Sequence, residues 1–399
     1  MSTIKVDTIV SENTPTVNFT DGVNVSGVAT AHTILANNAN ISCITTATTF
    51  APSEGQLAHR NVVINGAMEI SQRTTSEASV AGGPAFTYNV VDRWVYGRNT
   101  TAVVTLSQAA DAPTGFKYCY QLDVTTAHAS PSYCRFVHRI EGNYIRRFGF
   151  GVAGTRYATL SFWHKHTKTG TNHVCIQNYA NDRSYVAAYT QSTTNTWEKA
   201  VITFPIDTSG TWVTTNAGGL LLQWPMCDDG NASSLDTWIA GNAVAVNSSQ
   251  VNNLDSTNNY FRLTGVQLEL GSAATPFEHR DFCDDLIRCQ RYYQKSYEYG
   301  TAPGTATNNG AVMHTLSVSQ AYASPGSVKF PVQMRATPTM TIYSASSGTA
   351  GKINCDSTDG NGSAFGHSET GSYFNRSNDS GGSGNNVIAR VQYTASAEL

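Results

Sequence analysis

Short runs in which apolar and polar residues alternate, separated by turn-forming residues, recur between residues 62 and 270 and constrain the fold more than any other feature. In LSFWHKH, for example, Leu160, Phe162 and His164 share one face of an expected strand. Strands are expected at residues 62–70, 92–96, 102–106, 117–124, 132–140, 158–165, 172–177, 185–190, 199–204, 219–224 and 260–270. Many short strands with almost no helical period predict an all-β fold, an antiparallel, jelly-roll-like β-sandwich.

Two of these runs carry a further expectation. KAVITFP has Val201 and Thr203 on one side and Ile202 and Phe204 on the other, so its largely apolar faces predict a strand that is central or faces another copy of the chain. The last run has an irregular step at Gly265, which is typical of a bulge inside a strand.

A helical period appears after Pro276, which ends strand pairing. Phe282, Leu286, Cys289 and Tyr293 recur at steps of four, three and four, which is one face of an α-helix. The sequence therefore predicts a short connecting helix over 279–298.

Beyond residue 299 the chain returns to strands, expected at residues 312–318, 326–332, 339–343 and 387–394. Between the last two, residues 348–384 are rich in Gly, Ser, Asn and Asp, with Phe365, Tyr373 and Phe374 embedded. Two interpretations are open: a flexible loop, or a distal surface on which small residues let aromatic rings meet a ligand.

The first 57 residues hold only short alternating pairs, such as Ile4 with Val6 and Val17 with Phe19. Strands this short cannot enclose a core within one chain, since three or more strands with a shared apolar face are needed. Three identical chains wound about one axis would supply the missing partners, and a disordered tail is the alternative. Residues 51–55 are an expected linker.

Composition limits the classes of partner. Only 13% of the residues are charged and the net charge is −3. The chain therefore lacks the excess of positive charge that attracts nucleic acid or an anionic membrane. No apolar run approaches the roughly 20 residues that span a bilayer, and the N-terminus lacks a secretory leader. We therefore expect synthesis in a cytoplasm and no membrane insertion. Eight widely spaced cysteines without a CxxC pair predict buried free thiols and no metal cluster.

The chain shows no motif of a known catalytic class. Asp182, Asp207, Asp228, Asp229 and Asp236 are carboxylates that a glycosidase could use, but no spacing singles out a pair. No nucleophile elbow, phosphate loop or His-Glu-x-x-His helix occurs, and no cofactor is expected.

Two groups of polar residues have open interpretations. His164 and His166 share a strand face. They are either a pair of metal ligands or part of a solvated face. Asp92, Arg93 and Glu269 suit either a salt bridge that closes the sandwich or a calcium site.

Aromatic rings beside polar side chains give the candidate binding residues, because sugars present apolar C–H faces with a hydroxyl rim. Core packing is the alternative for each ring. The candidates lie in a 179–185 loop, a 224–239 insertion and a 355–380 loop. They are Tyr179, Asp182, Arg183, Tyr185, Trp224, Asp228, Trp238, Tyr373 and Phe374. The acidic, Asn-rich stretch 228–259 is expected to be a long exposed loop, anchored by Leu235, Trp238 and Ile239.

Several motifs, in the order in which they occur, resemble the receptor-binding tail fibres of tailed bacteriophages, especially phages of marine bacteria. They are the opening MSTIKVDTIVSENTPTVNFTDGVNVSG, NVVINGAMEISQR, VDRW, WEKAVITFPIDTSGTW, RLTGVQLELGSAATPFEHRDFCDDLIRCQRYYQK, FPVQMRATPTMTIYS and the closing TASAEL. The resemblance covers most of the chain.

The resemblance implies a homotrimeric virion protein, located in the tail, that attaches the particle to a host surface glycan or protein without catalysis. The expected organisation is a tail-attachment stem (1–57) that meets tail tube or adaptor proteins, a β-sandwich (58–278), a connecting helix (279–298) and a distal receptor-binding tip (299–399). A polysaccharide depolymerase and a purely structural adaptor are the alternatives.

Overall fold

A computed structural model of the chain describes residues 58–227, 232, 234–245, 249–316, 323–356, 358–376 and 387–399. The predicted stem (1–57) lies outside these residues. The described part is almost entirely β, as predicted. No helix within the described ranges has the length and apolar character needed to cross a bilayer.

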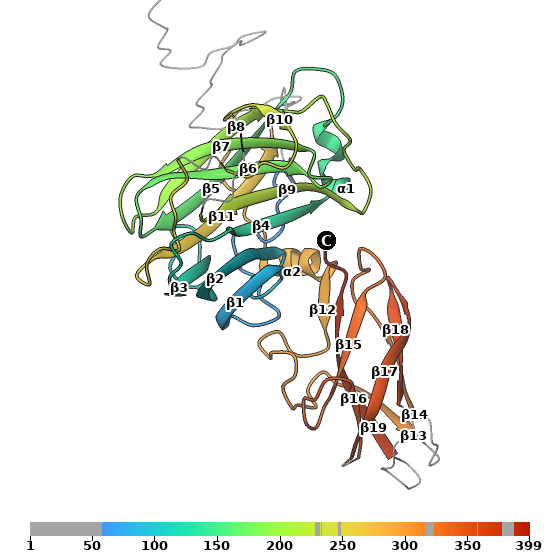
Figure 1. The fold of residues 1–399 in the computed structure, drawn as a ribbon. Helices are drawn as coiled ribbons and strands as arrows, with labels where there is room; N and C mark the ends of the chain where they lie inside the picture. Colours follow the sequence, from blue (N-terminus) through green and yellow to red (C-terminus); the bar gives the residue numbers. More distant parts are fainter. Residues whose placement is uncertain are drawn as a thin grey trace, which may run out of the picture. The chain divides into compact units, whose positions relative to one another are not determined.

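Within the described residues the larger sheet has eleven strands, and neighbouring strands pair antiparallel. Figure 1 labels these strands, β1 to β11. They are β1 (Ser76–Thr87), β2 (Trp94–Ala109), β3 (Cys119–Thr126), β4 (Tyr133–Glu141), β5 (Tyr157–His166), β6 (Gly170–Asn178), β7 (Arg183–Gln191), β8 (Glu198–Pro205), β9 (Gly218–Pro225), β10 (Trp238–Ala240) and β11 (Tyr260–Leu270). A short helix, α1 (Gly142–Ile145), and a 3-10 turn, η1 (Arg146–Phe148), connect β4 to β5.

Strand β2 is shared by two halves of this sheet. Its first residues, from Trp94 to Asn99, pair with β4, and its last, from Val103 to Ala109, pair with β3. One half therefore runs β10-β7-β6-β9-β4-β2 and the other β2-β3-β11-β5-β8. The halves face each other, since Phe162 of β5 lies 5.4 Å, between ring centroids, from Trp224 of β9. This is the predicted sandwich, with its core between the halves.

Most of the expected strands are present, but residues 62–70 do not form one. The chain takes left-handed turns at Asn65 (φ 57°) and Met68 (φ 60°). The Asn65 side chain bonds the N–H and carbonyl of Ile70 and the carbonyl of Asp92, so it satisfies backbone groups that a neighbouring strand would otherwise satisfy. The apolar residues of this segment are buried without β-pairing.

Strand β8 lies at the edge of the sheet, so a central position for KAVITFP is wrong. Its outward side chains are exposed, with Val201 at 49%, whereas Phe204 on the other face is fully buried. The alternative, that this strand faces another copy of the chain, stays a prediction.

The bulge expected at Gly265 is present. Pairing between β11 and β5 shifts register between Thr264 and Gln267, and Gly265 has a φ of +61°. A Cβ at this position would lie 2.7 Å from the Phe116 ring and 2.9 Å from that of Trp163.

We expect Gly265→Ala to lower the free energy of unfolding by about 1–3 kcal/mol, because the substitution adds both backbone strain and a steric clash. Chemical denaturation of the full chain measures it. Gly115→Ala is the matched control, since φ there is also positive (+94°) but no atom lies within 4 Å of the added carbon. An equal loss of unfolding free energy in both variants would show that the clash with the Phe116 and Trp163 rings does not contribute.

The connecting helix is shorter than the predicted 279–298. Helix α2 spans Phe282–Gln290 and is followed by the short strand β12 (Tyr293–Lys295). Cys289 is buried as expected, but Phe282 is 41% exposed and Asp285 is turned inward instead. Asp285 accepts a hydrogen bond from the Asn65 N–H (3.4 Å) and lies 3.9 Å from Arg280. These polar contacts, rather than the apolar period of the sequence, determine which face of the helix is buried.

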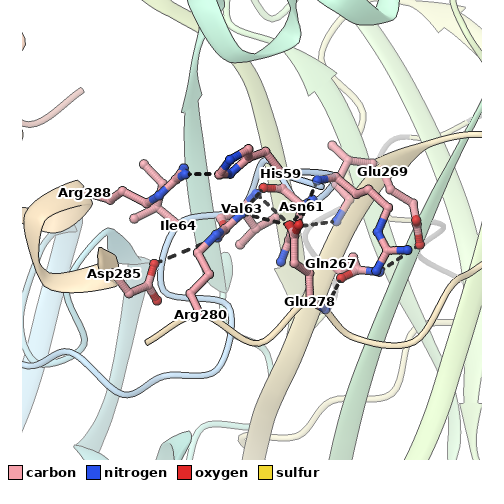
Figure 2. A network of polar contacts seen from close by, with 12 residues as sticks. His59, Asn61, Val63, Ile64, Gln267, Glu269, Glu278, Arg280, Asp285 and Arg288 are labelled. Atoms are coloured by element: carbon pink, nitrogen blue, oxygen red, sulfur yellow. Dashed lines mark hydrogen bonds and ion pairs between the residues drawn. The ribbon is translucent and has the colours of Figure 1, made fainter. Parts of the chain in front are cut away.

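Polar contacts tie the start of the described chain to the segment that precedes α2 (Figure 2). The Glu278 carboxylate accepts the N–H groups of Arg60 (3.2 Å) and Asn61 (2.9 Å). Arg280 donates to the carbonyls of Asn61 and Val63. The segment from 59 to 64 is thereby fixed between β11 and α2.

In the described part of the chain the second sheet has eight strands and its own core, which includes Met334, Ile353 and Phe374. Besides β12 they are β13 (Val312–Leu316), β14 (Ala323–Lys329), β15 (Thr339–Ser344), β16 (Lys352–Cys355), β17 (Thr358–Ser368), β18 (Gly371–Arg376) and β19 (Val387–Ser396). A flexible loop over 348–384 is wrong for its described part, which contains β16, β17 and β18. Cross-strand pairing gives this small-residue sequence its order.

Residues that follow β19 contact the first sheet. Glu398 pairs with Arg73 (3.1 Å) and Arg93, whose side chain is 1% exposed. The guanidinium groups lie over rings of the segment after α2, Arg73 at 3.7 Å from Tyr293 and Arg93 at 3.5 Å from Tyr292. We call Arg73, Asp92, Arg93 and Glu398 the ionic cluster.

The prediction of buried thiols is confirmed for some of the described cysteines and is wrong for Cys283. Cys119, Cys289 and Cys355 are buried free thiols, and Cys283 is the exposed exception. Cys43 lies outside the described part.

Candidate functional site

A pocket of about 300 Å³ opens on the outer face of the β-sandwich, over the half that contains β4, β6 and β9. Its ten described lining residues are Phe86, Arg135, Val137, Arg139, Gln177, Tyr179, Asn181, Leu221, Gln223 and Asn242. Along β4 these residues alternate with Phe136 and His138, which are buried on the core side. The period of two therefore puts the pocket residues on the face away from the core.

Two structures cover the same sheet face on either side of the pocket. Strand β10 and the residues on either side of it pack Leu235, Ile239 and Val244 onto Cys175 and Val186. Near Arg139, Tyr88 donates its hydroxyl to the Leu399 carbonyl (3.1 Å). Leu235, Trp238 and Ile239 are anchors, as predicted, but the 228–259 stretch is less exposed than expected, since Gln250, Asn253 and Leu254 are buried.

The two rings of the pocket lie against glycines. A Cβ on Gly97 would lie 2.5 Å from the Phe86 ring, and a Cβ on Gly218 would lie 2.3 Å from that of Tyr179. The absence of these side chains lets each ring approach the sheet backbone. Val137 and Leu221, which pack with Val95 and Tyr179, form the apolar floor of the pocket.

Amide side chains supply a polar wall. Gln223 donates to Gln177 (2.7 Å), and Gln177 donates to Asn242 (2.8 Å) and to the Ser184 hydroxyl (3.0 Å). This chain of hydrogen bonds fixes the orientation of the amides, so their remaining donors and acceptors have defined positions.

Two guanidinium groups complete the lining. The Phe86 ring lies 5.3 Å from the Arg135 guanidinium carbon and 5.7 Å from that of Arg139. Arg139 also donates to the Leu399 carbonyl. Rings, amides and guanidinium groups on an apolar floor form a surface that can contact C–H faces and hydroxyl groups together.

The predicted 179–185 loop contributes part of this pocket. Tyr179 and Asn181 line it. Asp182 instead accepts a hydrogen bond from Asn178. Arg183 pairs in bidentate fashion with Asp207 (2.6 and 3.0 Å), and this hydrogen-bonded carboxylate raises the pKa of Arg183. Asp182 and Arg183 therefore fix the loop and do not line the pocket.

Three predicted rings belong to cores rather than to a ligand surface. Tyr185 is 3% exposed, and Trp224 and Phe374 are fully buried, so none presents a ring face. Each lies on the inward side of its strand, where apolar burial dominates. Trp238 is half-buried against Tyr185 and Trp212 and donates to the Pro205 carbonyl (2.7 Å). Asp228 lies outside the described residues.

In the second sheet Tyr373 is 53% exposed and stacks on Phe365, with 5.7 Å between ring centroids. The two are cross-strand neighbours on β17 and β18. This exposed pair keeps Tyr373 as a candidate.

The other polar candidates are buried within the protein. His164 and His166 are 1% and 0% exposed, so a solvated strand face is wrong. Within the described ranges no three His, Cys, Asp or Glu side chains gather as a metal site would require. Asp92 forms an ion pair with Arg73 (3.2 Å), as the salt-bridge interpretation predicts, and Arg93 pairs with Glu398. Glu269 accepts hydrogen bonds from the N–H and hydroxyl groups of Thr275.

Sequence analysis missed most of the pocket, including Phe86, Arg135, Arg139, Gln177 and Gln223. A signal was present in YCRFVHRI, where Arg135, Val137 and Arg139 alternate with the core residues. This alternation identifies the outward face of the strand. It does not show which other segments of the chain lie beside that face and form a pocket.

No protein-family model matches this sequence, and no curated protein matches it significantly. Among solved structures, the enzymatically active domain of bacteriophage CBA120 tailspike protein 4 is 15% identical with a TM-score of 0.30. The match covers 53% of this chain and 21% of that one, so this chain spans about a fifth of the length of the matched domain.

Two further matches are to proteins described by sugar binding or by carbohydrate-binding modules. A putative sugar-binding protein from Bacteroides thetaiotaomicron is 12% identical, with 53% of this chain and 99% of that one covered and a TM-score of 0.32. The tandem CBM22 domain of Paenibacillus barcinonensis Xyn10C is 9% identical, with 82% and 100% covered and a TM-score of 0.24. Function must therefore be argued from the residues of this chain.

Proposed function

We propose that this chain is a non-catalytic receptor-binding protein of a phage tail that attaches the virion to a carbohydrate on the host surface. The observation that carries the proposal is the pocket on the outer face of the sandwich, which combines Phe86 and Tyr179 with ordered amides. Such a lining suits a sugar, because rings pack on its C–H faces while amides bond its hydroxyl groups.

The sequence motifs that resemble tail fibres support the virion context. In this proposal the chain is a homotrimer, and residues 1–57 join it to tail tube or adaptor proteins. Three pockets per fibre, and several fibres per particle, would convert weak individual contacts into firm attachment through effective concentration.

Binding is favoured over hydrolysis by the chemistry of the pocket. None of its ten described lining residues is Asp or Glu. Glycoside hydrolysis ordinarily requires two carboxylates on either side of the scissile bond. A depolymerase would therefore need a different site, and a purely structural adaptor would not need the pocket.

The test is the binding of fluorescently labelled full-length protein to host cells and to their extracted surface polysaccharide. Tyr179→Ala removes a ring that lines the pocket, and we expect about tenfold weaker binding, equivalent to about 1.4 kcal/mol. Tyr157→Ala is the matched control, since that ring is 37% exposed on the same sandwich and does not line the pocket.

Tyr373→Ala distinguishes the pocket from the distal sheet. Binding that is lost with Tyr373→Ala but kept with Tyr179→Ala would overturn the assignment to the pocket. Release of reducing ends from the polysaccharide would overturn the non-catalytic assignment.

A further inference from the structure

We infer that the pocket binds an N-acetylated amino sugar, through the acetamido group that distinguishes such a sugar from its parent hexose. This inference rests on the proposed function and adds the class of carbohydrate. It starts from two carboxamides of the lining, Gln223 and Asn242, whose orientation is determined by the hydrogen bonds around them.

The hydroxyl group of Ser184 determines that orientation. Its single proton goes to the Gly241 carbonyl (2.6 Å), so its oxygen can only accept, from the Ala243 N–H (3.1 Å) and from Gln177 (3.0 Å). The nitrogen of the Gln177 carboxamide must therefore point towards Ser184, and its oxygen faces Gln223. This buried hydroxyl group thus sets which end of each amide donates.

The same constraint extends to the two pocket amides. Gln223 Nε2 donates to Gln177 Oε1 (2.7 Å) and to the Cys175 sulfur (3.9 Å), so the nitrogen of this amide is occupied. Asn242 Oδ1 accepts a hydrogen bond from Gln177 Nε2 (2.8 Å). None of the described residues bonds Gln223 Oε1 or Asn242 Nδ2. These two atoms are therefore an oriented acceptor and an oriented donor in the lining.

Apolar side chains lie beside these amides on the sheet. Val137 on β4 is the cross-strand partner of Gln223 on β9, and Leu221 on β9 is the partner of Gln177 on β6. Side chains paired in this way across antiparallel strands have Cβ atoms about 4.5–5.5 Å apart. The floor of the pocket therefore alternates apolar and amide side chains over a distance that one small ligand can span.

An acetamido group matches this arrangement in each of its three parts. Its N–H can donate to Gln223 Oε1, its carbonyl can accept from Asn242 Nδ2, and its methyl group can cover the apolar floor. A hydroxyl group can bond either amide, but it leaves the floor beside them without an apolar partner. The ring of the same sugar can pack on Tyr179, and a volume of about 300 Å³ accommodates a monosaccharide or a short segment of a chain.

The experiment is saturation-transfer difference NMR of the full-length protein with N-acetylglucosamine, N-acetylgalactosamine, glucose and galactose. We expect at least one N-acetylated sugar to bind about tenfold more tightly than its parent hexose, since the parent lacks both the amide and the methyl group. The acetyl methyl protons should receive more saturation than any ring proton, because they contact the floor. N-acetylglycine amide, which has the acetamido group but no sugar ring, should bind more weakly than that sugar.

Asn242→Asp tests the donor without removing the bond from Gln177, since an aspartate oxygen can still accept it. We expect this variant to lose most of its preference for the N-acetylated sugar, whereas Tyr179→Ala should weaken the binding of both the sugar and its parent. Asn258→Asp is the control for the added charge, because Asn258 is exposed on the same domain and does not line the pocket. Thermal unfolding of each variant shows whether it is folded before its binding is measured.

Equal binding of each N-acetylated sugar and its parent, or no binding of either N-acetylated sugar, would overturn the inference. Binding of N-acetylglycine amide as tightly as the sugar, or an unchanged preference in Asn242→Asp, would also overturn it. In those cases weaker cell binding of Tyr179→Ala would still uphold the proposed carbohydrate function. Unchanged cell binding in that variant would reject both.

Discussion

Replacing Glu398 by alanine is expected to lower the free energy of unfolding by about 3–5 kcal/mol, because it leaves two arginines of the ionic cluster without their shared carboxylate. Arg93 is 1% exposed and Glu398 is 7% exposed, so water cannot readily replace the lost pairing. Burial by itself would lower the pKa of Arg93, yet Glu398 more than offsets this and the pKa is raised. Because an arginine side chain is not deprotonated in proteins, the guanidinium group stays charged when its partner is removed.

Chemical denaturation of the full chain measures this loss, with Glu298→Ala as the control. Glu298 is an exposed carboxylate outside the ionic cluster, and its removal should change stability by less than about 0.5 kcal/mol. The double variant Arg93→Met with Glu398→Leu should recover part of the stability, since an apolar pair needs no compensating charge. A Glu398→Ala variant as stable as the control would contradict the role assigned to the cluster.

Stability is also expected to fall steeply as pH decreases from about 6.5 towards 5, because four of the described histidines, His138, His164, His166 and His173, are buried and burial lowers the pKa of each. Burial lowers the pKa of His164 to about 4, and those of His138 and His166 well below the usual value. The unfolded chain, with histidine pKa values near 6.5, therefore binds protons first as the pH falls. His138, His164 and His166 should each cost about 2 kcal/mol of stability at pH 5, and His173, whose pKa is also lowered, adds to this loss.

The sign follows from proton binding, since stability is complete above the unfolded pKa and is lost below it. Thermal or urea unfolding between pH 7.5 and 5 is the measurement. His166→Phe should reduce the loss of stability between pH 7.5 and 5 by the contribution of one histidine. His314→Gln, at an exposed position, should leave that loss unchanged. A profile that is flat over this window would refute the prediction.

The sequence predicts the fold class because alternation is a local property. Leu160 and Phe162 on β5, or Phe136 and Ile140 on β4, show a period of two that any partner strand would satisfy. Residues 62–70 also look like a strand, but the Asn65 amide, which bonds the backbone at Ile70 and Asp92, makes them a buried turn. That outcome depends on contacts distant in the sequence.

The binding site could be predicted only in part, for a related reason. Tyr179 and Asn181 combine ring and amide in one loop, which the sequence displays directly. Tyr185 and Trp224 are also aromatic residues with polar neighbours in the sequence, but they lie at strand positions whose side chains point into the core. Arg135 and Arg139 become pocket residues because β1 and the segment around β10 border the same face, which no local pattern encodes.

The position of β11 has a consequence for the order of events during synthesis. It is the last strand of the large sheet in the sequence, yet it lies between β3 and β5. Until residue 270 has emerged from the ribosome, β3 and β5 each present an unpaired edge, and such edges favour association with other nascent chains. Closure of the sandwich must therefore await nearly complete translation of this domain, so slower elongation before β11 should increase aggregation rather than assist folding.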